Sequence, residues 1–128
     1  MQQKREEEAM AKGKMFKVCE TSNYVEPAKH TLTHSFPLIS PKTCEGAQYE
    51  FHITEIRPGG TAEDDVHPNE DHAFYCISGR AMAKVEGEEM LMEPGCALWV
   101  PKGAKHSFKV LGGETYKIAV VFAPPRKM

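Results

Sequence analysis

The sequence predicts an all-β protein with a single domain, and three observations support this prediction. The chain has 128 residues, about the commonest size of one domain, which leaves little material for a second hydrophobic core. From Phe16 onward, short segments of β-branched, aromatic and alternating residues are interrupted about every eight to twelve positions by Gly, Pro or Asn. None of the later segments has the pattern of a helix. Such a chain buries its apolar faces sheet on sheet, as a sandwich, a jelly roll or a closed barrel, and composition does not choose among these.

The first 15 residues differ from the rest of the chain. They are highly charged, contain the run Arg5 to Glu8 before Gly13, and are poor in branched apolar side chains. We therefore expect a flexible or frayed helical arm over residues 1–15, with no chemical role, followed by one β-domain over residues 16–128.

The clearest predicted strand extends from Tyr49 to Ile56. Aromatic and aliphatic side chains alternate with polar ones along it, so that the two kinds lie on opposite faces. The strand ends at Pro58-Gly59-Gly60, a turn sequence. Further Gly and Pro turns separate the later expected strands, and short turns of this kind favour antiparallel neighbours. These strands are Ala73–Ser78, Ala81–Val85, Glu88–Met92, Ala97–Val100, Ser107–Leu111 and Tyr116–Phe122.

The charge and hydropathy of the chain exclude some classes of partner. With a formal net charge of -2 and a pI near 6.3, the chain lacks the attraction that a nucleic acid or an anionic membrane would need. A small-molecule substrate is the better expectation. No apolar run approaches the ~20 residues that span a bilayer, and the N-terminal segment lacks the apolar core of a signal peptide. We expect a cytoplasmic protein in which the four widely spaced cysteines are reduced thiols.

Four residues in the second half of the chain form a spaced pattern. Gly95 is followed by five residues and Pro101, then by one residue and Gly103, then by two residues and His106. This spacing resembles the second signature motif of the cupin superfamily, which continues with three residues and an Asn. The chain departs from the motif only at this last position, where it has Val110.

The preceding segment is similar to the first cupin motif. Gly59, His67 and Gly79 fit that motif in register, whereas Asp65 stands where the family has its first His and His72 stands where it has Glu. The 15 residues between Gly79 and Gly95 match the short spacing of compact microbial cupins. The resemblance therefore implies a small single-domain metal-binding cupin, whose fold is a double-stranded β-helix, or jelly-roll, barrel.

The resemblance also implies a divalent metal ion in the mouth of the barrel. The family usually supplies three imidazoles and one carboxylate, and the two exchanged positions leave the same inventory in His67, His72, His106 and Asp65. Such a set suits Fe(II), Mn(II), Ni(II), Cu(II) or Zn(II). Glu70 is the alternative carboxylate ligand, or an acid or base near the metal. Up to two coordination positions would stay open for water, dioxygen or a substrate.

Strand parity predicts which neighbours of His72 share its direction. If His72 faces the interior, Phe74 and Cys76 do so as well, and Tyr75 and Ile77 face outward against the other sheet or a partner subunit.

The positions of His52 and Trp99 in the predicted strands suggest what these two side chains do. His52 lies in the middle of a predicted strand, so it either enters the same pocket as a catalytic or substrate-contacting residue or is structural. Trp99 is expected to pack between the sheets.

The functional hypothesis is a metal-dependent enzyme that acts on a small polar metabolite. An oxygenase is favoured over an isomerase or epimerase and over a decarboxylase or lyase, because three imidazoles and one carboxylate hold Fe(II) with positions left for O2 and substrate. The alternative is a non-catalytic sensor or carrier that binds a small molecule, possibly without metal.

Association into a homodimer is also expected. An open sheet edge in a small barrel benefits from being covered, and Phe16–Cys19 or Thr31–Phe36 is the expected edge strand.

Overall fold

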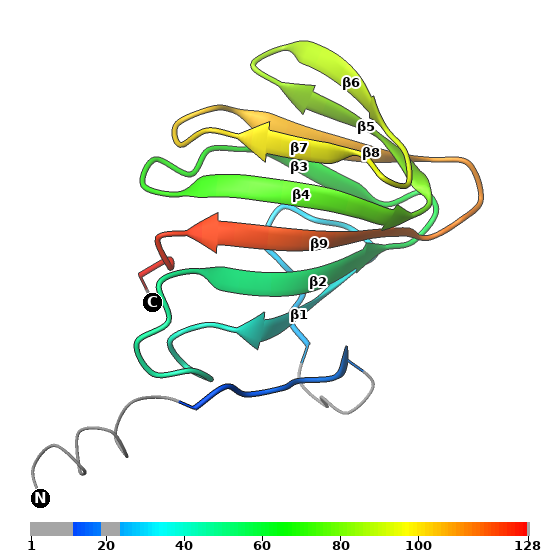
Figure 1. Ribbon diagram of the computed structural model, residues 1–128. Helices are drawn as coiled ribbons and strands as arrows, with labels where there is room; N and C mark the ends of the chain where they lie inside the picture. Colours follow the sequence, from blue (N-terminus) through cyan, green and yellow to red (C-terminus); the bar gives the residue numbers. More distant parts are fainter. Residues whose placement is uncertain (1–11, 19–23, 128) are drawn as a thin grey trace, which may run out of the picture.

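The computed structural model describes residues 12–18 and 24–127, and these residues contain nine β-strands and no α-helix (Figure 1). The strands are β1 (Thr33–Ile39), β2 (Glu50–Ile56), β3 (Thr61–Asp65), β4 (Asp71–Ser78), β5 (Arg80–Val85), β6 (Glu88–Met92), β7 (Ala97–Val100), β8 (His106–Leu111) and β9 (Tyr116–Ala123). Within this described part of the chain, there is no helix long and apolar enough to cross a membrane.

The strands form two antiparallel sheets that face each other. One sheet has the order β1-β2-β9-β4-β7 and the other has the order β3-β8-β5-β6. The last strand, β9, lies between β2 and β4, so strands far apart in the sequence become neighbours (Figure 1). This crossing order is that of a jelly roll, and the predicted all-β jelly-roll barrel is confirmed.

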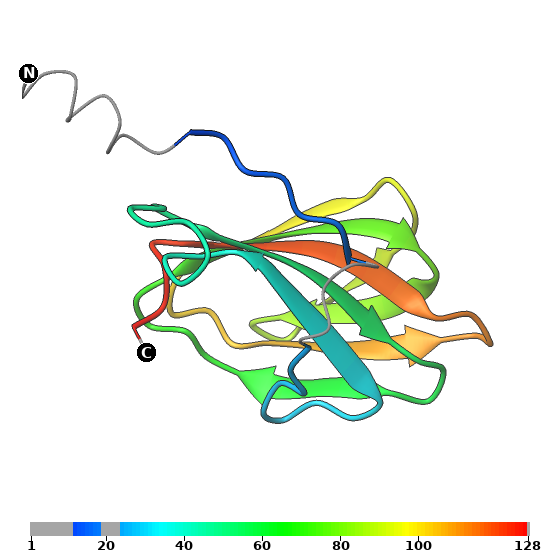
Figure 2. The same cartoon turned by 90° about the horizontal axis from the view of Figure 1, so that it is seen from below.

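The segment before β1 connects the two sheets on one side of the barrel. Val25 pairs with Ser35 of β1, whereas His30 pairs with Ala62 of β3 (Figure 2). The segment thus contacts an edge strand of each sheet and forms one wall of the interior.

The seven strands expected from the sequence are all present, with ends shifted by two residues at most. Strand β3 was not predicted from the sequence, and β1 was predicted only as part of a possible dimer edge. Both lie at a sheet edge, where one row of backbone groups needs no partner strand and the strand pattern is relaxed. Strand β1 contains Pro37 next to an irregularity in register, and β3 is acidic, so neither has the expected alternation.

The interior between the sheets follows the predicted parity of β4. His72, Phe74 and Cys76 are buried, and Tyr75 and Ile77 are exposed on the outer face. The prediction for Trp99 is wrong, because its indole is 66% exposed. Its neighbours Leu98 and Val100 face inward on β7, which turns Trp99 to the outside.

Several sequence predictions fall partly or wholly on residues that the structure does not describe. Residues 1–11 of the predicted arm and Cys19 of the possible edge strand lie outside the described residues. In the described remainder of these segments, Met15 is exposed and Phe16 and Lys17 are not in a strand. The cysteines within residues 24–127 are free thiols.

Candidate metal centre

The two motif regions meet because a turn of one binds a loop of the other. Pro101 and Ala104 close the turn between β7 and β8 with a backbone hydrogen bond of 3.1 Å. Within it, the amide of Gly103 donates to the carbonyl of His67 in the β3–β4 loop at 2.9 Å. Gly103 has a φ of 84°, which glycine adopts without the strain of a side chain. The Pro-x-Gly spacing of the sequence thus becomes a contact that holds the loop.

A second motif glycine is required by close packing. Gly79, between β4 and β5, has a φ of 75°, and a Cβ at this position would lie 2.4 Å from the carbonyl oxygen of Thr115. Only glycine lets β4 turn there against the start of β9. The turn fixes the end of β4, the strand that carries His72.

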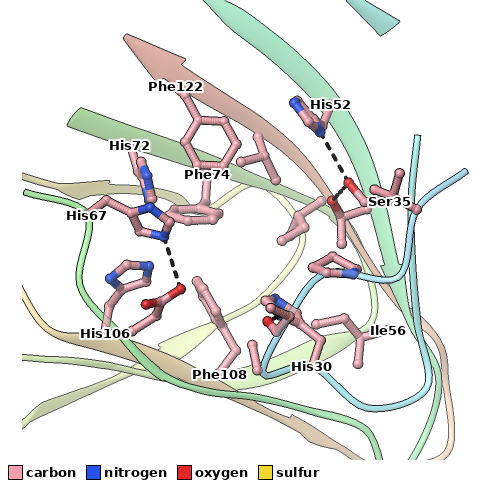
Figure 3. A pocket seen from close by; sticks show the side chains of 18 of the residues that line it. His30, Ser35, His52, Ile56, His67, His72, Phe74, His106, Phe108 and Phe122 are labelled. Atoms are coloured by element: carbon pink, nitrogen blue, oxygen red, sulfur yellow. Dashed lines mark hydrogen bonds and ion pairs between the residues drawn. The ribbon is translucent and has the colours of Figure 1, made fainter. Parts of the chain in front are cut away.

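Three histidines from different elements converge at one end of the interior (Figure 3). His67 belongs to the β3–β4 loop, His72 to β4 and His106 to the first position of β8. One ring nitrogen from each lies within 4.8 Å of the others. The ring centroids are 4.2 Å apart for His67 and His72, and 5.2 Å apart for His72 and His106. This cluster of His67, His72 and His106 is called the histidine cluster below.

His72 is the most deeply buried member of the histidine cluster. Its side chain is 2% exposed, and neither ring nitrogen has a hydrogen-bond partner among the described residues. Burial, together with the neighbouring imidazoles of His67 and His106, lowers its pKa to about 3. His72 is therefore neutral near pH 7 and has a free lone pair. A buried polar atom without a partner costs about 1–3 kcal/mol, and a bound metal ion would satisfy it.

The other two rings are oriented by neighbouring groups. Nδ1 of His106 lies 3.1 Å from the carbonyl oxygen of Ala104, so this nitrogen donates and Nε2 keeps its lone pair. Nε2 of His67 lies 3.3 Å from the carboxylate of Asp65. Burial lowers the pKa of His67, against the opposing effect of Asp65. The residues fit a divalent ion of the kind that imidazole favours.

The two candidate carboxylates lie beside the histidine cluster rather than within it. Among the described residues, the group of mutually close ligand atoms consists of the three histidines alone. Asp65 pairs with His67 and, at 3.5 Å, with Nζ of Lys29. Glu70 lies 3.8 Å from Nδ1 of His67. In this arrangement both carboxylates are neighbours of His67, and their roles as metal ligand or catalytic acid stay predictions.

The histidine cluster lines a cavity of about 330 Å³. Most of its wall is apolar and is contributed by the inward faces of β4, β8 and β9 (Figure 3). The wall residues include Phe74, Phe108, Ile118, Val120 and Phe122.

A second polar group borders the same cavity on β1 and β2. Nε2 of His52 lies 3.0 Å from the Glu50 carboxylate, and its Nδ1 lies 3.3 Å from Oγ of Ser35. Ser35 in turn lies 3.0 Å from Oγ1 of Thr54. Arg126 binds Glu50 through its backbone amide and two guanidinium nitrogens. His52 is thus held in a network apart from the histidine cluster, and its catalytic role stays a prediction.

Ser35 and Arg126 were not predicted from the sequence as residues of the site. Ser35 lies on the edge strand β1, which lacked a clear strand pattern, and Arg126 follows the last strand. The only signal was the polar face that Glu50, His52 and Thr54 share on the predicted strand, because a buried polar face needs partners from another element.

Comparison with known proteins supports the cupin assignment. The family described as Cupin domain, Cupin_2, matches residues 52–122. The chain is 32% identical over 89 residues to the tetracenomycin polyketide synthase protein TcmJ of Streptomyces glaucescens, covering 68% of this chain and 58% of that protein. It is 23% identical over 100 residues to the polyketide synthase CurC of Streptomyces cyaneus, covering 78% and 65%. The chain thus spans about three fifths of the length of these relatives.

Among solved structures, the fold is similar to that of the polyketide cyclase RemF of Streptomyces resistomycificus. The TM-score is 0.75 at 20% sequence identity, with 91% of this chain and 87% of that chain covered. The likeness concerns the fold of the barrel, and it extends beyond the 71 residues that the family match covers.

Proposed function

This chain belongs to the Cupin_2 family of cupin domains, and we propose that it is a metal-dependent enzyme that acts on a largely apolar small molecule bearing oxygen atoms. The observation that carries the proposal is the buried ring of His72, whose two nitrogens have no hydrogen-bond partner among the described residues and which lines the cavity. His67, His72 and His106 are the proposed metal ligands.

The chemistry proposed for this end of the cavity is Lewis-acid catalysis. A divalent ion held there would polarise a carbonyl or hydroxyl oxygen of the substrate. The protein contributes neutral imidazoles and an apolar wall that excludes water, and a low-dielectric surrounding strengthens each electrostatic interaction within it.

The substrate class follows from the wall of the cavity. Phe74, Phe108 and Phe122 favour a ring system or an extended apolar chain over a small, wholly polar metabolite. This proposal departs from the small polar metabolite that the sequence led us to expect. The relatives are named as a polyketide synthase protein and a polyketide cyclase, and we therefore propose ring closure in a polyketide-type substrate as the reaction.

An oxygenase is the second candidate. Three imidazoles leave several positions of a six-coordinate ion open, which suits O2 and a substrate at Fe(II) as well as it suits a Lewis acid. The sensor or carrier without turnover is the remaining alternative.

The metal content of the purified protein tests the proposed ligands. We expect about one divalent ion per chain in the wild type and its loss in His72→Ala. His34→Ala is the matched control, because this ring stacks on Tyr24 at 4.2 Å and does not line the cavity. Stoichiometric metal in both variants would contradict the ligand assignment.

A synthetic aromatic poly-β-ketone, offered with and without O2, separates the reactions. Ring closure in both atmospheres supports the cyclase, and substrate loss that requires O2 supports the oxygenase. An unchanged substrate in both, with metal bound, contradicts the enzymatic proposal and favours the binding protein.

A further inference from the structure

The cavity has a second polar end, formed by four buried side chains of two adjacent strands. Glu50, His52 and Thr54 alternate along β2 and therefore share its inward face. Ser35 on β1 is the register partner of Thr54. Ser35, His52 and Thr54 all line the cavity, and Figure 3 shows Ser35 and His52 across the cavity from the histidine cluster.

The direction of each hydrogen bond in this group follows from Glu50. Although burial opposes it, hydrogen bonds from Arg126 and His52 lower the pKa of Glu50 to about 2, so its carboxylate is ionised and only accepts. Nε2 of His52 must therefore carry a proton and donate to Glu50. Burial lowers the pKa of His52, which leaves a neutral ring whose Nδ1 accepts.

The hydroxyl groups of Ser35 and Thr54 donate their protons in the same direction, toward Glu50. Ser35 donates its only proton to Nδ1 of His52, and so it can only accept from Thr54. Thr54 then donates its hydroxyl proton to the oxygen of Ser35. In this arrangement all three contacts carry a proton, and the oxygens of Ser35 and Thr54 have lone pairs left but no proton left to donate.

We propose that Ser35 and Thr54 form a subsite that accepts a hydrogen bond from a phenol or enol hydroxyl of the ligand, opposite the proposed metal site. The proposal deepens the proposed function and rests on it, because the rest of the ligand extends toward the histidine cluster. A ligand that places only a carbonyl against Ser35 and Thr54 finds no donor in these two side chains and binds there less tightly.

The spacing of the two ends sets the shape of the ligand. The ring of Phe122 lies 4.2 Å from that of His72 and 5.4 Å from that of His52, centroid to centroid. Its side chain thus stands between the two polar groups, and the guanidinium of Arg126 covers it at 4.2 Å. An aromatic ring system that lies along Phe122, with an oxygen at each end, fits this arrangement.

Binding of two probes to the metal-loaded protein tests the subsite. 2-Naphthol has a donor, and 2-methoxynaphthalene presents the same ring and oxygen without one. We expect calorimetry to show about tenfold tighter binding of 2-naphthol to the wild type, the effect of one hydrogen bond. In Thr54→Val and in Ser35→Ala we expect the ratio to fall to about two or less.

The controls separate recognition from folding. Thr54→Ser keeps the hydroxyl and should retain the wild-type ratio, whereas Thr54→Val changes little but the oxygen. Thermal unfolding of each variant establishes that it is folded. Equal binding of both probes to the wild type, or an undiminished ratio in folded Thr54→Val and Ser35→Ala, would overturn the proposal.

His72→Ala distinguishes this proposal from that of the metal site. We expect this variant to keep the preference for 2-naphthol, because the hydroxyl binds at the other end. A preference that disappears in His72→Ala would place the hydroxyl at the histidine cluster and overturn the subsite. If instead the wild-type protein holds no metal and still prefers 2-naphthol, the proposed function is contradicted and the subsite stays supported.

Discussion

The cavity joins two buried polar groups that differ in how their hydrogen-bonding capacity is used. Each oxygen of Glu50 accepts from Arg126, and one accepts from His52 as well. In the histidine cluster, by contrast, both nitrogens of His72 lack any partner among residues 12–18 and 24–127. Glu50 and His72 are buried to a similar depth, since Glu50 is 1% exposed and His72 is 2% exposed.

This difference shows what each group contributes. A satisfied buried network stabilises the fold, and breaking one of its members leaves the others without partners. An unsatisfied group costs stability unless it binds something. We therefore expect loss of Glu50 to weaken the fold, and loss of His72 to weaken binding while leaving the metal-free fold intact.

The largest effect is expected from Glu50→Ala. This substitution leaves His52 and Arg126 without their shared acceptor, and we expect the free energy of unfolding to fall by roughly 3 kcal/mol in urea titrations. Glu55→Ala is the control on the same strand, because its pair with Lys117 is partly exposed and should contribute less than about 1 kcal/mol. Equal losses in both variants would mean that the network has no special structural role.

Metal addition is expected to stabilise the protein through the histidine cluster. Zn(II) or Ni(II) at about 100 times its dissociation constant should raise the free energy of unfolding by about 2.7 kcal/mol. The same addition to His72→Phe should give almost no rise, and without metal this variant should be as stable as the wild type or more so. Urea titrations with metal and with chelator measure both. If metal stabilises His72→Phe as much as the wild type, His72 is not a ligand and the contrast with Glu50 does not hold.

Acid is expected to weaken the Glu50 network. The pKa of Glu50 is about 2 in the folded protein and near its usual 4.5 in the unfolded chain, so the unfolded state binds more protons between these values. The stabilisation is complete above about pH 4.5 and is lost as the pH falls toward 2, on the order of 3 kcal/mol in total. Urea titrations from pH 6 to 3 should show a shallower slope for Glu50→Gln. Identical slopes would contradict this assignment.

Substitutions on the outer face of β4 and β7 are expected to have the smallest effect on the cavity. Trp99, Tyr75 and Ile77 are exposed there, and we predict that this face packs against a second copy of the chain. Light scattering should show a dimer for the wild type and a monomer for Trp99→Lys, with metal content unchanged in both. A monomeric wild type would contradict the predicted homodimer.

Much of the fold could be predicted because turn residues and strand alternation are local properties of the sequence. Gly79 and Gly103 mark turns that only glycine adopts without strain, and their spacing brings His67, His72 and His106 together. The edge strands β1 and β3 were not recognised as parts of the sheets, since an edge tolerates proline, charge and irregular register.

The details of the site were harder to predict. Spacing along the chain predicts which residues lie near one another in the candidate site, but it does not give the direction of a side chain at an irregular edge. Asp65 lies at a shift in register on β3 and points to His67 and Lys29. Ser35 and Arg126 come from segments without motifs, so their convergence on Glu50 and His52 required the tertiary structure.

The central claim is that the histidine cluster binds a metal ion directly. X-ray absorption spectroscopy of the zinc-loaded protein tests this claim. We expect three imidazole nitrogens about 2.0–2.1 Å from the zinc in the wild type, and fewer in His106→Ala. A protein that retains no stoichiometric zinc, or a spectrum without imidazole ligands, would contradict it.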